Sequence, residues 1–218
     1  MQDYNPPPDH GLNVLFQDEA LLVLDKPGGL LSVPGRGPAK QDSLLTRARQ
    51  RFADAECVHR LDMETSGLMI LARGKAAQRV LNRQFELREI GKRYTAVVQG
   101  VVAPASGEIN LPLICDWPNR PRQVVDHRLG KPSATRFRVL RHDRQGGTTR
   151  VSLQPLTGRS HQLRVHMQSL GHSILGDRLY APPDGAAQAA RLMLHASALA
   201  FRHPRSGRTC HFFSRAPF

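Results

Sequence analysis

Cysteine is scarce in this 218-residue chain, and its distribution excludes a disulfide-stapled fold. The three cysteines are far apart and odd in number, so they form neither a CxxC pair nor a disulfide framework. This usage fits a reducing compartment, and we expect a cytoplasmic protein. The ten histidines include no His-Glu-x-x-His motif, and the closest two, His161 and His166, are five residues apart. We therefore expect no metal site.

Long hydrophobic runs are also missing. Apolar stretches such as residues 20–24 are far too short to cross a bilayer. The N-terminal residues contain no basic segment followed by an apolar one, which a secretory signal would require. The sequence therefore predicts a protein without a membrane partner.

Positive charge is what the sequence has in excess. Lys and Arg number 31 against 18 Asp and Glu, a formal net charge of +13. Such an excess favours a polyanionic partner, because each neutralised phosphate releases counterions. Arg accounts for 26 of the 31 cations, and its planar fork suits phosphates and stacking on bases. A GC-rich genome would also enrich Arg, so the net charge carries more weight than the Arg bias.

The hydrophobic pattern predicts an α+β fold with a mixed, largely antiparallel sheet and flanking helices and loops. A Pro-rich arm is expected over residues 1–13, followed by one globular unit over residues 14–218, with two lobes around a cleft as the alternative. Expected strands cover residues 21–24, 68–72, 93–99, 134–140, 149–156, 195–201 and 209–213. Three helices are expected. The first is capped by Asp42 or Ser43 and runs to about Phe52, the second covers residues 75–89, and the third covers residues 160–170 with Ser160 as its N-cap.

One segment carries more chemical information than the rest of the chain: residues 59–67 read HRLDMETSG. It places Asp62 between a basic residue and a Thr-Ser-Gly turn, which predicts a sharp bend with the carboxylate aimed outward. Such an aspartate can act as a nucleophile or a base if its surroundings keep it ionised. An isolated Asp-x-x-Ser-Gly is more often a solvated surface turn, so the segment has to be weighed together with others.

Three further segments belong with it: residues 92–96, residues 157–166, and residues 176–180 together with 191–196. Each alone has an ordinary structural interpretation. Tyr94 would be a core tyrosine on a strand, Arg159 a surface charge beside a helix, and Leu163 a core residue. Their order along the chain makes the combination specific.

Together the four segments resemble the successive motifs of the RluA-type pseudouridine synthases, and the similarity covers the chain from Leu21 onward. The resemblance implies the catalytic fold of that family over residues 14–218, with a central active-site cleft. It also implies an enzyme that isomerises uridine in RNA without a cofactor or metal. Only about twenty residues precede the matched region, so we expect no S4-like RNA-binding domain.

The resemblance assigns catalysis to Asp62, Tyr94 and Arg159. Asp62 could attack C1′, add to the base or take the 2′ proton, and the sequence leaves these routes open. Arg159 would hold the carboxylate, while Tyr94 would stack on the flipped uracil and assist the loss of the C5 proton. Substrate binding is expected for His59, Arg60, Arg93, Leu163 and Arg164, with Lys92, Arg120, Arg122 and Arg178 as further candidates for phosphate contact.

Residues 5–7, 29–36 and 111–121 narrow the resemblance to bacterial family members that modify 23S rRNA and the anticodon stem-loop of tRNAs. RNA stem-loops are therefore the expected partner, because loop uridines are the easiest to extract from their stack. We expect a monomer.

The sequence has two alternative interpretations besides an RNA-isomerising enzyme. A non-catalytic RNA-binding or ribosome-assembly protein would use the same basic surface, but it would have no need of Asp62. A glycoside hydrolase would use Asp62 and Glu64 as its carboxylate pair. Their spacing in one loop is poorly suited to groups about 5–9 Å apart on opposite sides of a bond, and a sugar hydrolase gains nothing from a high positive charge.

Overall fold

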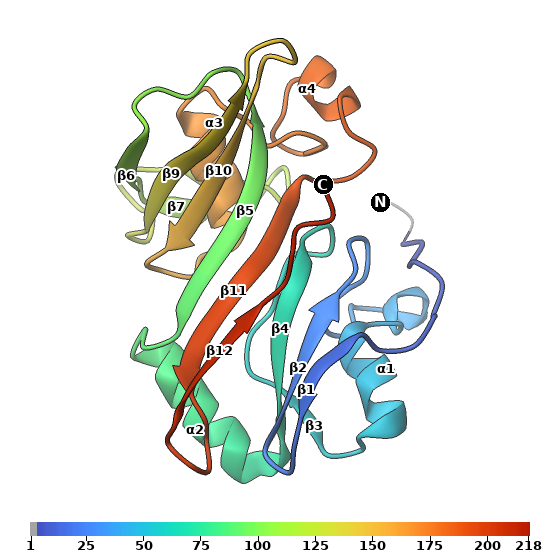
Figure 1. Ribbon diagram of the computed structural model, residues 1–218. Helices are drawn as coiled ribbons and strands as arrows, with labels where there is room; N and C mark the ends of the chain where they lie inside the picture. Colours follow the sequence, from blue (N-terminus) through green and yellow to red (C-terminus); the bar gives the residue numbers. More distant parts are fainter. Residues whose placement is uncertain (1–3) are drawn as a thin grey trace. The chain divides into compact units, whose positions relative to one another are not determined.

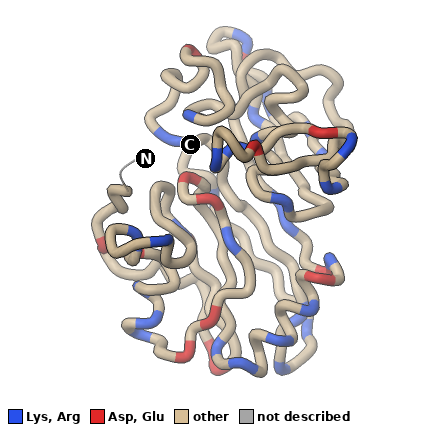
Figure 2. The backbone as a smooth tube through the Cα atoms, turned by 180° about the vertical axis from the view of Figure 1, so that it is seen from behind, with Lys and Arg blue, Asp and Glu red and all other residues tan. Residues whose placement is uncertain are grey.

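The computed structural model describes residues 4–218, which fall into two compact units. The first unit contains the chain up to Lys92 and the segment His195–Pro217, and the second contains Arg93–Leu194 and Phe218. In Figure 1 the first unit is drawn in blue to teal and again in red. Lys and Arg occur on helices, strands and loops of both units (Figure 2).

The first unit is built on a sheet whose strands follow the order β1-β2-β4-β11. Strand β12 pairs with β11, and β3 pairs with β4. All of these pairs are antiparallel except β4 with β11, which is parallel. The elements are β1 (Val14–Gln17), β2 (Leu21–Lys26), η1 (Pro38–Lys40), α1 (Leu44–Arg51), β3 (Ala55–Cys57), β4 (Ser66–Arg73), α2 (Gly74–Glu86), β11 (Leu194–Arg202) and β12 (Thr209–Phe213).

Strands β2 and β4 read as continuous apolar runs because their side chains are buried whichever way they point. Residues 21–24 and 68–72 are all buried. Helix α2 contributes Ala77 and Leu81 to the same hydrophobic cluster, and Figure 1 shows α2 lying alongside these strands. The predicted strands and the amphipathic helix that follows them are confirmed, the helix ending at Glu86.

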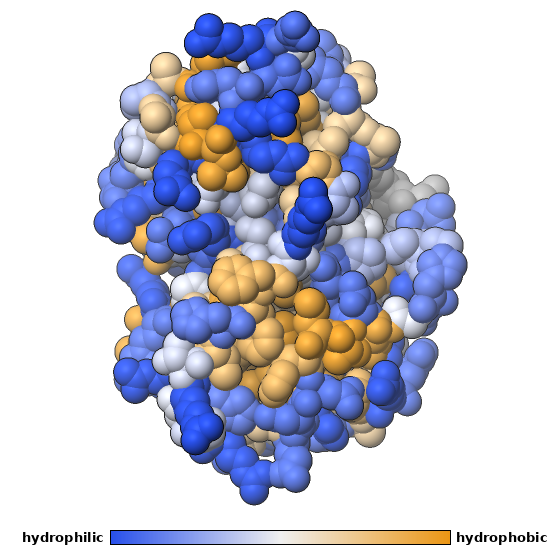
Figure 3. Space-filling model, viewed as in Figure 1, coloured by the Kyte–Doolittle hydropathy of each residue, from blue (hydrophilic) through white to orange (hydrophobic). Residues whose placement is uncertain are grey.

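Hydrophobic side chains also gather on the outer face of the first unit, over β1 and β12 (Figure 3). Phe213 and Leu15 are among the exposed hydrophobic residues there, at 70% and 43% exposure. Single exposed apolar side chains are common on folded proteins, so this face does not by itself indicate a function.

The second unit contains an antiparallel sheet with the strand order β5-β10-β9-β6 and a separate hairpin of β7 and β8. Helix α3 packs against the sheet: its Leu163 and Met167 lie in one cluster with Val151 and Leu153 of β10. The elements are β5 (Gly91–Gln99), β6 (Ser106–Asn110), β7 (Leu113–Cys115), β8 (Gln123–Val125), β9 (Ala134–Asp143), β10 (Thr148–Pro155), α3 (Gln162–Ser169) and α4 (Pro183–Ala187).

The expected α+β fold with a mostly antiparallel sheet is confirmed. One local prediction is wrong: Ser160 does not cap α3. The helix starts at Gln162 after His161, whose φ of 53° places it in the left-handed region, and no side-chain oxygen caps it there. None of the helices in residues 4–218 combines the length and hydrophobicity needed to cross a bilayer.

Residues 1–3 of the predicted N-terminal arm lie outside the described part of the chain. The following residues are fastened to the first unit. The Tyr4 hydroxyl donates to the Asp42 carbonyl at 2.9 Å and accepts from the Leu31 amide at 3.0 Å. The Arg47 guanidinium donates to the Pro7 carbonyl at 2.7 Å. The arm therefore supports the loop that follows β2.

Candidate active site

Asp62 lies in the loop between β3 and β4 and opens a tight turn. The Thr65 amide donates to the Asp62 carbonyl at 3.1 Å, which closes the turn around Met63 and Glu64. Asp62 itself is half-buried, and the residues after the turn enter β4 directly. The predicted bend at Asp62 is therefore present.

Both neighbours of Asp62 are held by hydrogen bonds from the segment after β2. Ser32 Oγ accepts from the Leu61 amide at 3.0 Å and donates to the Leu61 carbonyl at 2.7 Å. The Met63 carbonyl accepts from the Gly29 amide at 2.9 Å and from Lys26 Nζ at 2.9 Å. Because the residues on each side of Asp62 are fixed, the carboxylate starts from a defined backbone position.

Lys26 is the most unusual of these supports, because its side chain is completely buried. Its ammonium group donates to the carbonyls of Pro27, Leu30 and Met63 at 2.8, 2.7 and 2.9 Å. A buried charge is tolerated only when its donors are satisfied, and here three carbonyl dipoles point at the ammonium. Lys26 thus joins the end of β2 to the turn that carries Asp62.

His59 anchors the start of the same loop. Strand β3 pairs with β4 up to Cys57 opposite Leu71, and the next amide along β4, that of Ile70, donates to His59 Nε2 at 2.9 Å. The imidazole also stacks on Phe85 of α2, with ring centroids 4.7 Å apart. Burial, with a smaller effect of the Lys92 charge, lowers the pKa of His59 to about 3. The ring is therefore neutral and Nε2 is free of a proton, as its role as an acceptor requires.

The end of the loop is tied to the C-terminal segment of the first unit. Ser66 Oγ is hydrogen-bonded to His195 Nδ1 at 2.9 Å, and His195 Nε2 to Ser214 Oγ at 3.0 Å. Gly67 pairs with Ala196, and its φ of 109° lies in the left-handed region. A Cβ at Gly67 would lie 2.4 Å from the Ala196 carbonyl oxygen, so only glycine allows β4 and β11 to approach this closely.

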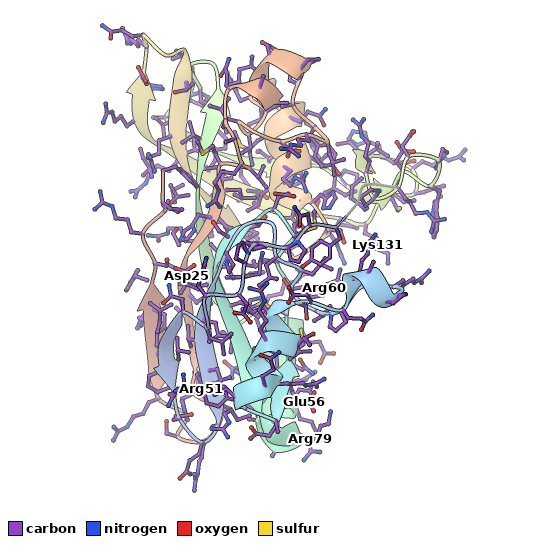
Figure 4. All side chains as sticks on the ribbon, turned by 90° about the vertical axis from the view of Figure 1, so that its right-hand side faces the viewer. Asp25, Arg51, Glu56, Arg60, Arg79 and Lys131 are labelled. Atoms are coloured by element: carbon purple, nitrogen blue, oxygen red, sulfur yellow. The ribbon has the colours of Figure 1, made fainter. Side chains whose placement is uncertain are left out.

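Arg60 differs from its neighbours in the loop because its side chain is exposed. Figure 4 labels it on the segment that follows β3. The loop thus presents one exposed cation, Arg60, two residues before Asp62. The residue before it, His59, faces inward. Three predicted site residues lie on this loop: His59, Arg60 and Asp62. Of these, His59 makes the contacts of a residue that anchors the loop.

In the second unit, Tyr94 and Leu163 belong to the same hydrophobic cluster. Tyr94 lies on β5 opposite Leu153 of β10 and is half-buried, and Leu163 lies on α3 with 7% of its surface exposed. Arg93, the residue before Tyr94, is exposed. The structure therefore brings two of the predicted site residues together at one edge of the core.

Arg159 lies in the turn before α3, and Gln162 holds that turn in place. The oxygen Oε1 of Gln162 accepts from the Arg159 amide at 3.0 Å and from Thr157 Oγ1 at 2.7 Å. The amide nitrogen Nε2 of Gln162 donates to the Ala134 carbonyl at 2.9 Å. The side chain of Arg159 is half-buried, and its Nε donates to the Pro132 carbonyl at 3.3 Å.

Arg164 is placed differently from the other predicted cations. Its guanidinium is buried and forms a bidentate ion pair with Asp177, with Nε and one terminal nitrogen each 2.7 Å from a carboxylate oxygen. It also lies over the Tyr180 ring, 4.9 Å from the centroid. Contact with a phosphate would require this pair to break, so the arrangement is that of a structural brace between α3 and the segment that follows it.

The supporting roles of Lys26, Ser32 and Gln162 are not among the predictions made from the sequence. A lysine two residues after the apolar run 21–24, at the end of the same strand, is a usable signal, because the strand places the start of its side chain in the core. Within residues 4–218, no group of three or more His, Cys, Asp or Glu side chains is arranged to hold a metal ion.

Comparison with known proteins identifies the family to which this chain is similar. Residues 20–169 match the family of RNA pseudouridylate synthases. The chain is 52% identical over 218 residues to the dual-specificity RNA pseudouridine synthase RluA of Escherichia coli strain K12, covering 100% of this chain and 99% of that protein. The identity to the Haemophilus influenzae protein of the same name is 49% over 216 residues, covering 99% and 98%.

A solved structure of an RNA pseudouridylate synthase domain is also similar to this chain. The human RNA pseudouridylate synthase domain containing 1 superposes with a TM-score of 0.82 and 30% identity, covering 98% of this chain and 87% of that one. The family match spans more than half of the chain, and the similarity to the bacterial relatives is end to end. The chain therefore belongs to the RNA pseudouridylate synthase family, whose members are isomerases that act on RNA.

Proposed function

We propose that this protein converts specific uridines to pseudouridine in 23S rRNA and in the anticodon stem-loop of tRNAs, acting as a monomer with Asp62 as its nucleophile. One observation carries most of the weight: the identity of 52% to a dual-specificity RNA pseudouridine synthase extends over the whole chain. The name of that relative supports two classes of RNA substrate. The non-catalytic alternative is not favoured, because the full-length relatives are named as synthases.

The reaction breaks the bond between N1 and C1′, turns the base and joins C5 to C1′. A proton leaves C5 and one is added to N1, so the atoms balance without a cofactor. A single carboxylate can start this sequence if it is held in position, and the turn at Asp62 is fixed on both sides by Ser32, Lys26 and Gly29. We assign the first step to Asp62 on this ground.

Tyr94 and Arg159 are proposed to act on the same reaction. The guanidinium of Arg159 would hold the carboxylate by a charge-assisted hydrogen bond, and the turn before α3 fixes its backbone. The ring of Tyr94 would stack on the extracted uracil, with Leu163 packed beside it in the same cluster, and its hydroxyl would assist the loss of the C5 proton. These roles follow from the family motifs and from the placement of each side chain within its own unit.

The target uridine has to leave its stack, because C1′ and both faces of the base are inaccessible inside a helix. Arg60 is the exposed residue of the Asp62 loop, and we propose that it fills the space vacated by the nucleotide or binds its phosphate. Arg93 is also exposed and is proposed to contact the RNA backbone. For His59 and Arg164 we propose positioning roles, since the Ile70 amide donates to Nε2 of His59 and Asp177 pairs with Nε and one terminal nitrogen of Arg164.

The test compares wild type with Asp62→Asn on tRNA anticodon stem-loops and 23S rRNA fragments, with pseudouridine mapped chemically. Asp62→Asn should lose at least about three orders of magnitude in turnover, in line with the removal of other nucleophiles. Its fold should persist, because Ser32, Lys26 and backbone atoms hold the turn. Glu64→Gln, in the same turn, is the matched control and should remain active. A wild type inert on every stem-loop, or an active Asp62→Asn, would refute the proposal.

A further inference from the structure

We infer that Trp117, in the turn of the β7–β8 hairpin, is a stacking platform for an unpaired base of the RNA substrate. The inference rests on the proposed function, because it assigns a second part of the same RNA to a place on the protein away from the reacting uridine. It adds a substrate-binding site to a hairpin that the reaction itself does not require.

The first observation is the exposure of the ring. Trp117 is 63% exposed, although tryptophan is among the residues that gain most from burial. The hairpin does not need it for packing: Leu113 and Val125 are the hydrophobic residues that the hairpin contributes to the cluster with Val165 and Tyr180. An exposed aromatic ring that the fold does not use is a candidate for intermolecular contact.

The ring is displayed on an ordered turn. Within the turn, the Asp116 amide donates to the Arg122 carbonyl at 3.0 Å, the Asn119 amide to the Asp116 carbonyl at 3.1 Å, and the Arg122 amide to the Asn119 carbonyl at 3.1 Å. The side chains of Asn119 and Asp116 are also hydrogen-bonded, at 3.0 Å. Because the backbone of this turn is already ordered, little further ordering of the turn is needed when a ligand stacks on the ring.

Positive charge lies against the ring and is in excess along the hairpin that carries it. The Arg120 guanidinium lies over the indole, 4.3 Å from its centroid, in a cation–π contact. Between residues 115 and 131 the chain has four cations, Arg120, Arg122, Arg128 and Lys131, against two acidic residues, Asp116 and Asp126. Figure 4 labels Lys131, which is exposed. An aromatic ring among cations is the combination by which proteins bind unpaired nucleotides: bases stack and phosphates pair.

The hairpin shares its supports with the turn that carries Arg159. The Gln123 amide donates to the Tyr180 hydroxyl at 2.7 Å, and this hydroxyl is hydrogen-bonded to His161 Nδ1 at 2.6 Å. Arg159 Nε donates to the carbonyl of Pro132, the residue that follows the bridge between Lys131 and Leu113. Trp117 and Arg159 are therefore held by one hydrogen-bonded framework within the second unit, so RNA bound by one is presented in a fixed relation to the other.

The experiment uses the intrinsic fluorescence of the protein, because Trp117 is its only tryptophan. Full-length Asp62→Asn protein, which should not turn over, is titrated with a uridine-containing anticodon stem-loop RNA. Base stacking should quench the emission saturably. The same strand annealed to its complement should quench it far less, because its bases are already stacked and paired.

Variants then separate stacking from charge. Trp117→Ala should weaken RNA binding about fivefold to a hundredfold, the range for loss of one base–aromatic stack, and raise KM while kcat stays near the wild-type value. Trp117→Phe should restore most of the affinity. Arg120→Ala should weaken binding and reduce the slope of log K against log salt by about one, whereas Trp117→Ala should leave that slope unchanged. Phe213→Ala, an exposed aromatic of the first unit, is the matched control and should bind RNA as wild type does.

Three results would overturn the inference: RNA binding without a change in emission, Trp117→Ala with wild-type affinity, or a change in oligomeric state on Trp117→Ala with RNA affinity intact. The last would indicate that the ring contacts a second copy of the chain. Each of these can occur while wild type still makes pseudouridine, so failure here is distinguishable from failure of the proposed function. A wild type that quenches with the stem-loop but forms no pseudouridine would refute only the latter.

Discussion

Acid should destabilise the protein through His59, and the size of the effect follows from the burial of its ring. Burial lowers the pKa of His59 from 6.5 to about 3, and Nε2 accepts a hydrogen bond from the Ile70 amide. Between these two pH values the unfolded chain binds a proton that the folded chain does not. Protonation therefore favours unfolding, so the contribution of His59 to stability is complete above pH 6.5 and is lost as the pH falls towards 3.

Each pH unit within this window costs about 1.4 kcal/mol, so the fall from pH 6.5 to pH 5 costs roughly 2 kcal/mol. The substitution His59→Gln keeps an acceptor for Ile70 but removes the titrating group. The unfolding free energy of the variant should therefore fall by about 2 kcal/mol less than that of wild type over this interval. Burial also lowers the pKa of His166, so the wild-type curve contains both histidines, and the difference between the two proteins isolates His59.

Urea unfolding followed by circular dichroism at several pH values between 7 and 5 measures this difference. An NMR titration of the His59 ring provides a direct check, since its resonances should not move in this range. Phe85→Ala removes the ring stacked on His59 and should raise the pKa back towards 6.5. Parallel stability curves for wild type and His59→Gln, or a His59 resonance that titrates near pH 6.5, would show that the reasoning from burial is wrong.

Three further substitutions test the supports of the two units. Lys26→Met removes the donor from three carbonyls beneath the Asp62 turn, and it should cost about 3–5 kcal/mol in urea unfolding and lower kcat as well. Gly67→Ala places a Cβ 2.4 Å from the Ala196 carbonyl oxygen at a φ that disfavours alanine; a soluble variant with wild-type Tm would contradict the account of this approach. Arg164→Ala leaves Asp177 buried without its cation and should cost about 3–5 kcal/mol, whereas the double variant Arg164→Met, Asp177→Leu should recover part of the loss.

The strands that are marked by one uninterrupted run of apolar residues could be predicted from the sequence. Residues 21–24 and 68–72 lie in uninterrupted apolar runs that end at Asp25 and Arg73, and both belong to central strands of the first unit. The bend at Asp62 could be predicted as well, because a carboxylate followed by Thr-Ser-Gly suits few other conformations. These predictions succeeded because the determining interactions lie within a few residues of each other.

The missed features depend on partners far away in the chain. The acceptors of Lys26 include the carbonyl of Met63, 37 residues later, so the position of this lysine after an apolar run indicates its burial but not this partner. Arg164 is predicted as a candidate for phosphate contact, and the sequence around it does not reveal its carboxylate partner, which is 13 residues away on the segment after α3. Ser160 has the side chain of an N-cap, but Gln162 reaches back to the preceding turn and takes the Arg159 amide instead.

The supports of the Asp62 turn suggest that stability and chemistry are separable in this protein. Ser32, Lys26 and Gly29 hold the turn through the backbone of Leu61 and Met63, and these particular bonds do not involve the carboxylate of Asp62. A reacting group on a loop can keep a defined position only if such contacts replace the regular hydrogen bonds that a strand or helix would supply. Variants of the supporting residues should therefore lose activity and stability together, whereas Asp62→Asn should lose activity alone. A plot of kcat against unfolding free energy that fails to separate these two classes would mean that the nucleophile itself holds the turn.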